Sequence, residues 1–254
     1  MSKIVITGSA SGIGREVAKK LSDSGHEIIS IDLRDADIIA DLSTSEGRQK
    51  AIADTLEKTG SEIDILITAA GMGGHLADGK LVMIVNYFGT VELLDGFFPA
   101  MKGRAGAAAL ALSSNSAQMG VDPENELVKA LLAHDEQAAI DVVGDMPSAA
   151  TYGLSKHAVA RAVRSRAHEW GTAGVRLNAI APGMTETPML QGVRDNPDLK
   201  GALENIPVPL DRTANVDEIA NIIVMMVSEA FSFMHGSVLY VDGGTDAVVR
   251  PDQF

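Results

Sequence analysis

Tyr152 and Lys156 are the two residues whose types and spacing point most directly to chemistry. They are four positions apart, so on a helix their side chains share one face about one turn apart. A free phenol has a pKa of about 10 and is a poor base at neutral pH. A neighbouring ammonium favours the phenolate and lowers that pKa toward the range that proton-transfer catalysis needs. The same spacing also arises by chance, as a surface tyrosine and a solvated lysine, so support must come from the rest of the chain.

A glycine-rich turn near the N-terminus provides such support. The apolar run 4–6 leads through Gly8, Gly12 and Gly14 into a helical stretch at 15–21. Glycines allow the backbone to approach a pyrophosphate, which is stabilised by the positive end of the helix. Because a strand precedes the turn and a helix follows it, the pattern favours a dinucleotide site over a purely structural turn.

Asp32 gives the expected cofactor. It ends the second apolar run, 27–31, and lies 18 residues (32 − 14) after Gly14. At this place a carboxylate accepts hydrogen bonds from the adenosine ribose and repels a 2′-phosphate, so NAD is preferred over NADP. Arg34 leaves the alternative that a basic residue just beyond the strand holds the phosphate.

The remaining strands and helices alternate, which predicts one α/β domain over 1–254 built on a doubly wound, Rossmann-type parallel sheet. Further strands are expected at 63–67, 107–112, 175–180 and 237–241, and helices at 45–58, 80–101, 152–170 and 216–228. Ala181, Pro182 and Gly183 are expected to break the strand at 175–180. Ser114 follows the strand 107–112 and therefore lies at the carboxyl edge of the sheet, where open α/β sheets bind ligands.

Two segments interrupt the alternation. Residues 121–146 are acidic and place apolar residues at helical spacing, which predicts a helical insertion that packs on the body of the protein or on a second subunit. Residues 184–212, here called the flap, are rich in Met, Leu and Pro, and we expect a mobile cover for an apolar substrate. Its apolar side chains are Met184, Met189, Leu190, Val193 and Ile206.

The net charge and composition of the chain exclude several classes of function. A formal charge of −13 argues against sequence-independent binding to nucleic acid or an anionic membrane. There are no cysteines, and the six histidines show no paired spacing with a carboxylate, so no metal site is expected. The longest apolar run found, 219–227, is too short to span a bilayer, and no signal-like segment begins the chain. A cytoplasmic protein is expected.

Taken together, the glycine turn, Asn86, Ser114, the Tyr152–Lys156 pair and the Ala-Pro-Gly at 181–183 resemble those of the short-chain dehydrogenase/reductase family. The resemblance covers essentially the whole chain. Within the family the chain is similar to the bacterial 3α-hydroxysteroid dehydrogenase/carbonyl reductases, in particular over 31–53, 85–100, 170–190 and 242–254.

The resemblance implies a role for each catalytic residue. Tyr152 would be the general acid and base, and Lys156 would lower its pKa while holding the nicotinamide ribose. Ser114 would bind the carbonyl or alkoxide oxygen, and Asn86 would fix a water linking Lys156 to bulk solvent. The residues implied around NAD are Gly8, Ser11, Gly12, Ile13, Gly14, Asp32, Asp41, Leu42, Ala70, Gly71, Tyr152, Lys156, Pro182, Gly183, Thr185 and Thr187. Those implied around the substrate are Ser114, Met184, Met189 and Leu190.

The chain departs from the family pattern at two places. Residues 68–71 read Thr-Ala-Ala-Gly where many members have Asn-Asn-Ala-Gly, which leaves open the adenine-side hydrogen bonds of that asparagine. Ser114 and Tyr152 are 38 positions apart (152 − 114), and 121–146 accounts for the excess length. This insertion would obstruct the helix contact through which many members form tetramers, so we expect a homodimer through another face.

Three functions are compatible with these residues. The first is NAD-dependent interconversion of a 3α-hydroxysteroid, or another bulky apolar alcohol, with its ketone. The second keeps the reaction but acts on an aromatic alcohol of the coniferyl type. The third, an NAD-binding scaffold without chemistry, predicts decay of the catalytic set, whereas all four catalytic positions are intact.

Overall fold

Seven parallel strands form one sheet in the computed structural model, which describes residues 1–119, 122 and 124–253 and, of Lys200 and Ala202, the backbone alone. The strands are β1 (Lys3–Thr7), β2 (Glu27–Asp32), β3 (Ile38–Ile39), β4 (Ile65–Thr68), β5 (Ala108–Leu112), β6 (Arg176–Pro182) and β7 (Val238–Val241). Their order across the sheet is β3-β2-β1-β4-β5-β6-β7. The order reverses between β1 and β4, and such a switch point is where open α/β sheets form a ligand crevice.

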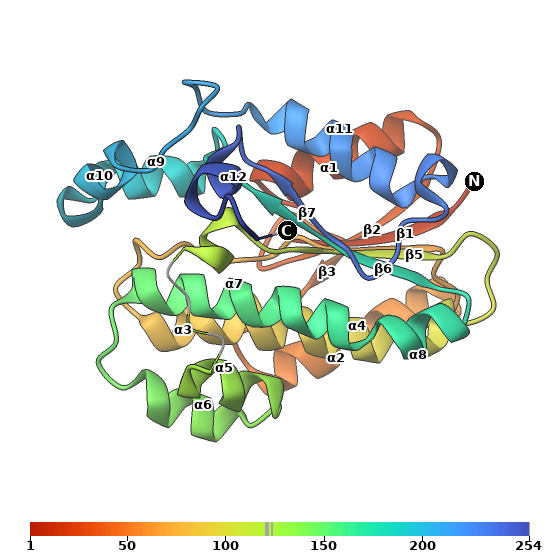
Figure 1. Ribbon diagram of the computed structural model, residues 1–254. Coiled ribbons are helices and arrows are strands. Elements are labelled where there is room, and N and C mark those ends of the chain that lie inside the picture. Colours follow the sequence, from red (N-terminus) through yellow and green to blue (C-terminus); the bar gives the residue numbers. More distant parts are fainter. Residues whose placement is uncertain (120–121, 123, 254) are drawn as a thin grey trace.

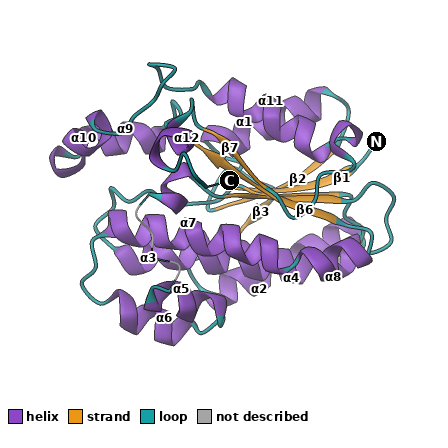
Figure 2. Cartoon of the chain, in the orientation of Figure 1, coloured by secondary structure: helices purple, strands orange, loops and turns teal. Residues whose placement is uncertain are grey.

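Helices cover both faces of the sheet, which is why the strands are continuous apolar runs (Figures 1 and 2). The helices α1 (Gly12–Asp23) and α11 (Val216–Val227) lie on one face. On the other face lie α2 (Ser45–Thr59), α3 (Gly79–Met83), α4 (Gly89–Met101), α7 (Ser148–Ser165) and α8 (Ala167–Thr172). Successive residues of β1 show the two layers, since Val5 is buried in one core and Ile4 and Ile6 in the other. The predicted doubly wound fold is confirmed.

A continuous helical segment, Gly79–Met101, corrects the expectation that no stretch is long and apolar enough to span a membrane. Within the described part of the chain its length and composition meet that test, but 67% of its most apolar window is buried inside the protein. It is a core helix here. Its middle, η1 (Ile84–Phe88), is a π-helical turn between α3 and α4, a feature often found at functional sites.

The segment 121–146 contains two short helices, α5 (Glu126–Leu132) and α6 (Glu136–Val143). Val121, its first expected residue, lies outside the described residues. Leu127, Val128 and Leu131 are fully buried in the same core as α7, so the apolar stripe packs on the body of this chain rather than being left for a second subunit.

The flap forms two helices, α9 (Pro188–Asp195) and α10 (Pro197–Glu204), at one end of the sheet (Figure 1). Its mobility stays a prediction. The last helix, α12 (Thr245–Val249), follows β7, and two 3-10 turns, η2 (Asn115–Gln118) and η3 (Glu229–Phe231), follow β5 and α11.

Several elements differ from those expected. The strand β3 has two residues and α12 has five, too few to produce a periodic signal. The helix expected at 152–170 begins at Ser148 and is divided into α7 and α8. The strand β6 continues through Pro182, because a proline can end a strand where no further ladder bond from its nitrogen is needed.

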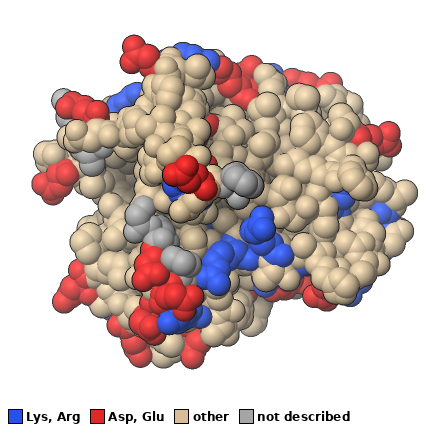
Figure 3. All heavy atoms as spheres, viewed as in Figure 1, with Lys and Arg blue, Asp and Glu red and all other residues tan. Residues whose placement is uncertain are grey.

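Charged side chains are unevenly distributed on the face in Figure 3. Asp and Glu lie at many places around its edge, whereas Lys and Arg gather mainly in one group near the middle. The view matches the formal charge of −13.

Candidate active site

A single cleft of about 600 Å³ lies along the carboxyl ends of the strands at the switch point. Of the site residues predicted from the sequence it is lined by Gly8, Ser11, Gly12, Ile13, Gly14, Asp32, Asp41, Leu42, Ala70, Gly71, Ser114, Tyr152, Lys156, Pro182, Gly183, Met184, Thr185, Thr187, Met189, Leu190, Val193 and Ile206. Asn86 is buried and does not itself line the cleft. Residues separated by almost two hundred positions in the sequence therefore meet in one groove.

The proposed acid and base, Tyr152, stands on the second turn of α7 beside Ser114. Burial raises the pKa of the Tyr152 phenol, and a hydrogen bond with the Ser114 hydroxyl opposes that rise. The Ser114 oxygen also accepts hydrogen bonds from the backbone N–H and the hydroxyl of Ser116, at 3.2 and 3.0 Å. The hydroxyls of Tyr152 and Ser114 thus lie together in the cleft wall.

Lys156 is buried one turn further along α7. Its Nζ donates to the Leu112 carbonyl oxygen at 2.9 Å, and burial lowers the pKa of Lys156 to about 8. The Ser113 hydroxyl donates to the Lys156 carbonyl oxygen at 2.9 Å, so two hydrogen bonds dock α7 on the carboxyl end of β5. The lowering of the Tyr152 pKa by Lys156 stays a prediction, because the ammonium is directed at Leu112.

Asn86 is fully buried in η1, whereas an asparagine within a helix is usually exposed. Its Oδ1 accepts from Met72 N at 2.8 Å, and its Nδ2 donates to Met72 O at 3.0 Å and to Ser155 Oγ at 3.3 Å. The amide therefore fixes the loop after β4 against α7. A Cβ on Gly71 would lie 3.1 Å from Asn86 Oδ1 and 3.4 Å from Lys156 Nζ. The water that Asn86 was expected to hold is not tested by these contacts.

The glycine turn fits a pyrophosphate. Gly8 has φ +69°, and a Cβ there would lie 2.6 Å from Ala70 N, while a Cβ on Gly14 would collide with the Gly8 carbonyl oxygen. The helix α1 begins at once, and its N-cap residue Ser11 makes no side-chain cap bond. The first N–H groups of a helix have no partner within the helix, so they are available to an anion at this end of the cleft.

Asp32 lies where the adenosine ribose is expected. Its carboxylate accepts from Ala10 N at 2.9 Å and from Leu33 N at 2.7 Å, which fixes its orientation at the cleft wall. Arg34 is exposed and is not among the residues that line the cleft. This arrangement favours the carboxylate over the arginine as the group that a ribose would meet.

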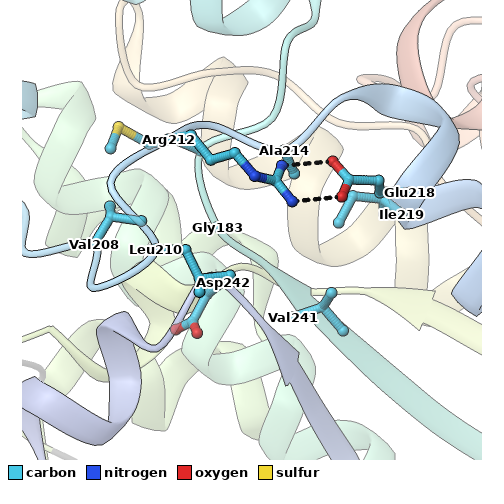
Figure 4. Close-up of a pocket in the computed structure, with 11 residues that line it drawn as sticks. Gly183, Val208, Leu210, Arg212, Ala214, Glu218, Ile219, Val241 and Asp242 are labelled. Atoms are coloured by element: carbon cyan, nitrogen blue, oxygen red, sulfur yellow. Dashed lines mark hydrogen bonds and ion pairs between the residues drawn. The ribbon is translucent and has the colours of Figure 1, made fainter.

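Thr185 and Thr187 are held by the return of the flap to the body. Ala214 N donates to Met184 O at 2.9 Å, and Thr185 forms a β-bridge with Ala214. A second, smaller pocket of about 100 Å³ lies beside this contact, where the Arg212 guanidinium pairs with Glu218 at 2.7 and 2.8 Å (Figure 4). Thr187 caps α9 through its hydroxyl, which accepts from Leu190 N at 3.2 Å.

The flap end of the cleft is apolar. Beyond the predicted residues, the sequence reasoning missed wall residues from the loop after β4, from α3 and η1, and from α10. They are Met72, Gly73, Gly74, Leu81, Val85, Leu199 and Leu203. Leu81 with Val85, and Leu199 with Leu203, have the i, i+4 spacing of one helix face, but the same spacing is typical of core residues.

The arrangement can bind a dinucleotide at one end and exchange a proton with a substrate oxygen at the other. Among the described residues, no group of three or more His, Cys, Asp or Glu could hold a metal ion. Among the described residues that line the cleft, the ionisable ones are Asp32, Asp41, Tyr152 and Lys156.

Comparison with known proteins agrees with this geometry. The family model "short chain dehydrogenase" matches residues 2–124, and the model "Enoyl-(Acyl carrier protein) reductase" matches residues 137–246. The 3-alpha-hydroxysteroid dehydrogenase/carbonyl reductase of Comamonas testosteroni is 45% identical over 258 residues, and the alignment covers 100% of both chains. The chain belongs to the short-chain dehydrogenase/reductase family.

Solved members of the short-chain dehydrogenase/reductase family share the fold. The 3-alpha-hydroxysteroid dehydrogenase from Pseudomonas sp. B-0831, solved in complex with NADH, aligns with a TM-score of 0.97 at 41% identity and covers 100% of both chains. A more distant relative, galactitol 2-dehydrogenase (L-tagatose-forming) of Cereibacter sphaeroides, is 29% identical over 94% of this chain and 92% of its own length. The family is confirmed, and the chain is an oxidoreductase.

Proposed function

We propose that this protein is an NAD-dependent oxidoreductase that interconverts a 3α-hydroxysteroid, or another bulky apolar secondary alcohol, with its ketone. One observation carries the proposal. Tyr152, Ser114 and Lys156 meet in the same cleft as the glycine turn and Asp32, so the proton-transfer group and the dinucleotide site are continuous.

The cofactor assignment rests on the fit of the residues. Gly8 and Gly14 allow a tight backbone turn that a side chain at either position would disrupt, and this turn lines the cleft where α1 begins. Asp32 supports NAD over NADP, since its charge would repel a 2′-phosphate. The similar Pseudomonas enzyme was solved with NADH. When bound, NAD would supply the acceptor for the hydride that leaves the carbinol carbon.

The protein's own residues then act on the substrate oxygen. In oxidation the Tyr152 phenolate accepts the hydroxyl proton as the C–O bond becomes a carbonyl, and in reduction the phenol returns it. Ser114 donates a hydrogen bond to the same oxygen as its charge changes. Lys156 would provide a positive charge near the phenol and would hold the ribose hydroxyls of bound NAD, and Asn86 keeps the loop at Met72 in place.

The substrate class follows from the flap end. Its walls are Met, Leu, Val and Ile side chains, which bind an apolar body and exclude water from the reacting atoms. The similar Comamonas enzyme is named for 3α-hydroxysteroids and carbonyl compounds, which are substrates of this kind.

We further propose that the enzyme is cytoplasmic and acts as a homodimer. The helices α5 and α6 cover the α7 side of the molecule, whereas β7 at the sheet edge is only half-buried along its length. A half-buried edge strand offers a face for a second copy. A tetramer by light scattering would count against this proposal.

The function is tested by following NADH formation with NAD and a 3α-hydroxysteroid, with a coniferyl-type alcohol as the second substrate and Tyr152→Phe as the blank. We expect turnover of the steroid that is lost in the variant. Activity on the aromatic alcohol alone would keep the chemistry and replace the substrate. Absence of activity on both, despite NAD binding, would favour a non-catalytic NAD-binding protein.

A further inference from the structure

Arg48 is a charged residue that the proposed chemistry does not use, yet it is almost completely buried, with a relative exposure of 1%. Its guanidinium contacts three other parts of the chain. Nε donates to Glu92 of α4 at 2.8 Å, and Nη2 donates to Glu136 of α6 at 2.5 Å. Nη1 donates to the carbonyl oxygen of Leu42 at 3.3 Å. Burying a guanidinium costs free energy unless it is paired and hydrogen-bonded. These three hydrogen bonds offset that cost and tie three segments of the chain together.

Leu42 connects this junction to the cleft. It lines the cleft wall next to Asp41, at the same end as Asp32. Its side chain packs on Gly89 of α4, since a Cβ at Gly89 would lie 3.2 Å from Leu42 Cβ. Its carbonyl is held by Arg48, so both sides of the residue are fixed from behind the wall.

The neighbouring backbone is fixed in the same way. A Cβ on Gly47 would collide with the Asp41 carbonyl oxygen, and Thr44 caps α2 by accepting from Gly47 N at 3.0 Å. Residues 41–44 are therefore pressed onto the start of α2, one turn from Arg48. The guanidinium is thus one hydrogen bond away from a residue of the cleft wall.

We propose that Arg48 is a positioning residue for the adenosine half of the dinucleotide site, and that Glu136 couples the α5 and α6 segment to dinucleotide affinity through it. The inference rests on the proposed function, because it requires the cofactor to lie along the Asp32 and Leu42 end of the cleft. Neither residue touches the cofactor. Arginine suits the role because its rigid planar fork donates in fixed directions to two carboxylates and a backbone carbonyl oxygen, a geometry that the compact charge of a lysine does not reproduce.

The test uses Arg48→Lys and Glu136→Gln in the full-length protein, with Asp141→Asn as the matched control. Asp141 is an exposed carboxylate on the same helix α6, so its substitution removes the same charge without touching Arg48. The measurements are the Kd of AMP, which represents the adenosine half alone, the KM for NAD, and kcat and KM for the alcohol.

For Arg48→Lys we expect the Kd of AMP and the KM for NAD to rise together by about three- to tenfold, the range for one or two lost hydrogen bonds. For Glu136→Gln, which keeps an acceptor but loses the charge, we expect about a two- to fourfold rise. In both variants kcat and the KM for the alcohol stay within twofold (roughly the scatter expected of a near-neutral change), and Asp141→Asn matches the wild type.

Unchanged AMP and NAD constants in folded Arg48→Lys, with only a lower melting temperature, would show a purely structural role and overturn the inference. A parallel loss in kcat would do the same. If Arg48→Lys does not fold, Glu136→Gln decides by the same criteria. Failure of the wild-type protein to bind NAD would instead overturn the proposed function, so the two failures are distinguishable.

Discussion

The two ends of the cleft are built in different ways. The dinucleotide end consists of backbone that approaches closely at Gly8 and Gly14, and of an acid, Asp32, held by two backbone N–H groups. The flap end consists of apolar side chains on α9, α10 and η1, and of the described side chains that line it only Tyr152 and Lys156 are ionisable. One end is specified by conformation and charge, and the other by shape.

This difference explains what each end determines. A backbone that only glycine allows, and a charge at a fixed place, admit few ligands, so this end determines the cofactor. Apolar walls bind many compounds of suitable size, because hydrophobic contact is non-directional. The reaction is therefore fixed where the two ends meet, at Tyr152, and the choice of substrate is left to the flap.

The largest effect is expected at the meeting point. Tyr152→Phe removes the hydroxyl that exchanges the proton and should lower kcat by about 10²- to 10⁴-fold, the usual contribution of general acid–base catalysis. NAD binding, measured by calorimetry, should remain within about twofold, because phenylalanine keeps the ring and only the hydroxyl is lost. A variant that retains most of its turnover would show that Tyr152 is not the residue that exchanges the proton.

Lys156 lies next to Tyr152 on α7, and its burial lowers the free energy of unfolding by an amount that depends on pH. Its pKa is about 8 in the folded protein and 10.5 in an unfolded chain, so between these values the unfolded state binds more protons. The wild type therefore gains about 3 kcal/mol of unfolding free energy from this group as pH rises from 8 to 10.5.

Lys156→Met lacks this dependence. Any stability advantage of the variant at neutral pH should shrink by that amount toward pH 10.5, in urea unfolding of the cofactor-free proteins. A difference between the two proteins that does not change with pH would mean that the ammonium is not buried as described.

Two glycines with positive φ, Gly8 at the dinucleotide end and Gly25 between α1 and β2, separate the effect of backbone conformation from that of close approach. Gly8 has φ +69° and Gly25 has φ +83°, but nothing lies within 4 Å of a Cβ at Gly25. Gly25→Ala should cost about 1–2 kcal/mol of stability, the price of a left-handed conformation for alanine, and leave NAD binding unchanged. Gly8→Ala should add a collision with Ala70 and weaken NAD binding by tenfold or more, roughly 1.4 kcal/mol. Equal dissociation constants for NAD in the two variants would contradict the place of Gly8 in the dinucleotide site.

Asp32 tests the charge at the same end. Asp32→Asn keeps an acceptor for Ala10 N but removes the repulsion of a 2′-phosphate, so the kcat/KM preference for NAD over NADP should fall by about tenfold. Arg34→Ala should leave the preference unchanged, because its side chain is exposed. Equal kcat/KM values with NAD and NADP in the wild type would contradict the assignment to NAD.

The smallest effect is expected at the flap end. Leu203→Ala removes part of a half-buried wall and should raise the KM for a steroid by about two- to fivefold, with no change for a small cyclic alcohol. Leu210→Ala is the control, since Leu210 is 64% exposed and lines the smaller pocket. An equal change for large and small alcohols would show that Leu203 does not contact the substrate body.

The sequence predicted the dinucleotide end better than the flap end, for a physical reason. Gly8, Gly14 and Asp32 are required by local backbone and charge, which a short motif records. Leu199 and Leu203 carry a helix-face spacing that any core helix shares, so their place in the cleft depends on how the flap folds back.

Long-range packing escaped the sequence reasoning for a similar reason. The burial of Asn86 follows from a π-helical turn that no local pattern announced. The contact of Arg48 with Glu136 joins residues 88 positions apart. The apolar stripe of α5 was predicted, but only the structure shows that it packs against α7.

The most direct test of the account uses a 3α-hydroxysteroid carrying deuterium on its carbinol carbon, incubated with NAD and the wild-type protein, with mass analysis of the reduced nucleotide. We expect the deuterium to appear in the NADH, a ketosteroid to form in equal amount, and Tyr152→Phe to yield neither. Ketone formation without label in the NADH, or no reaction while NAD is bound, would contradict it.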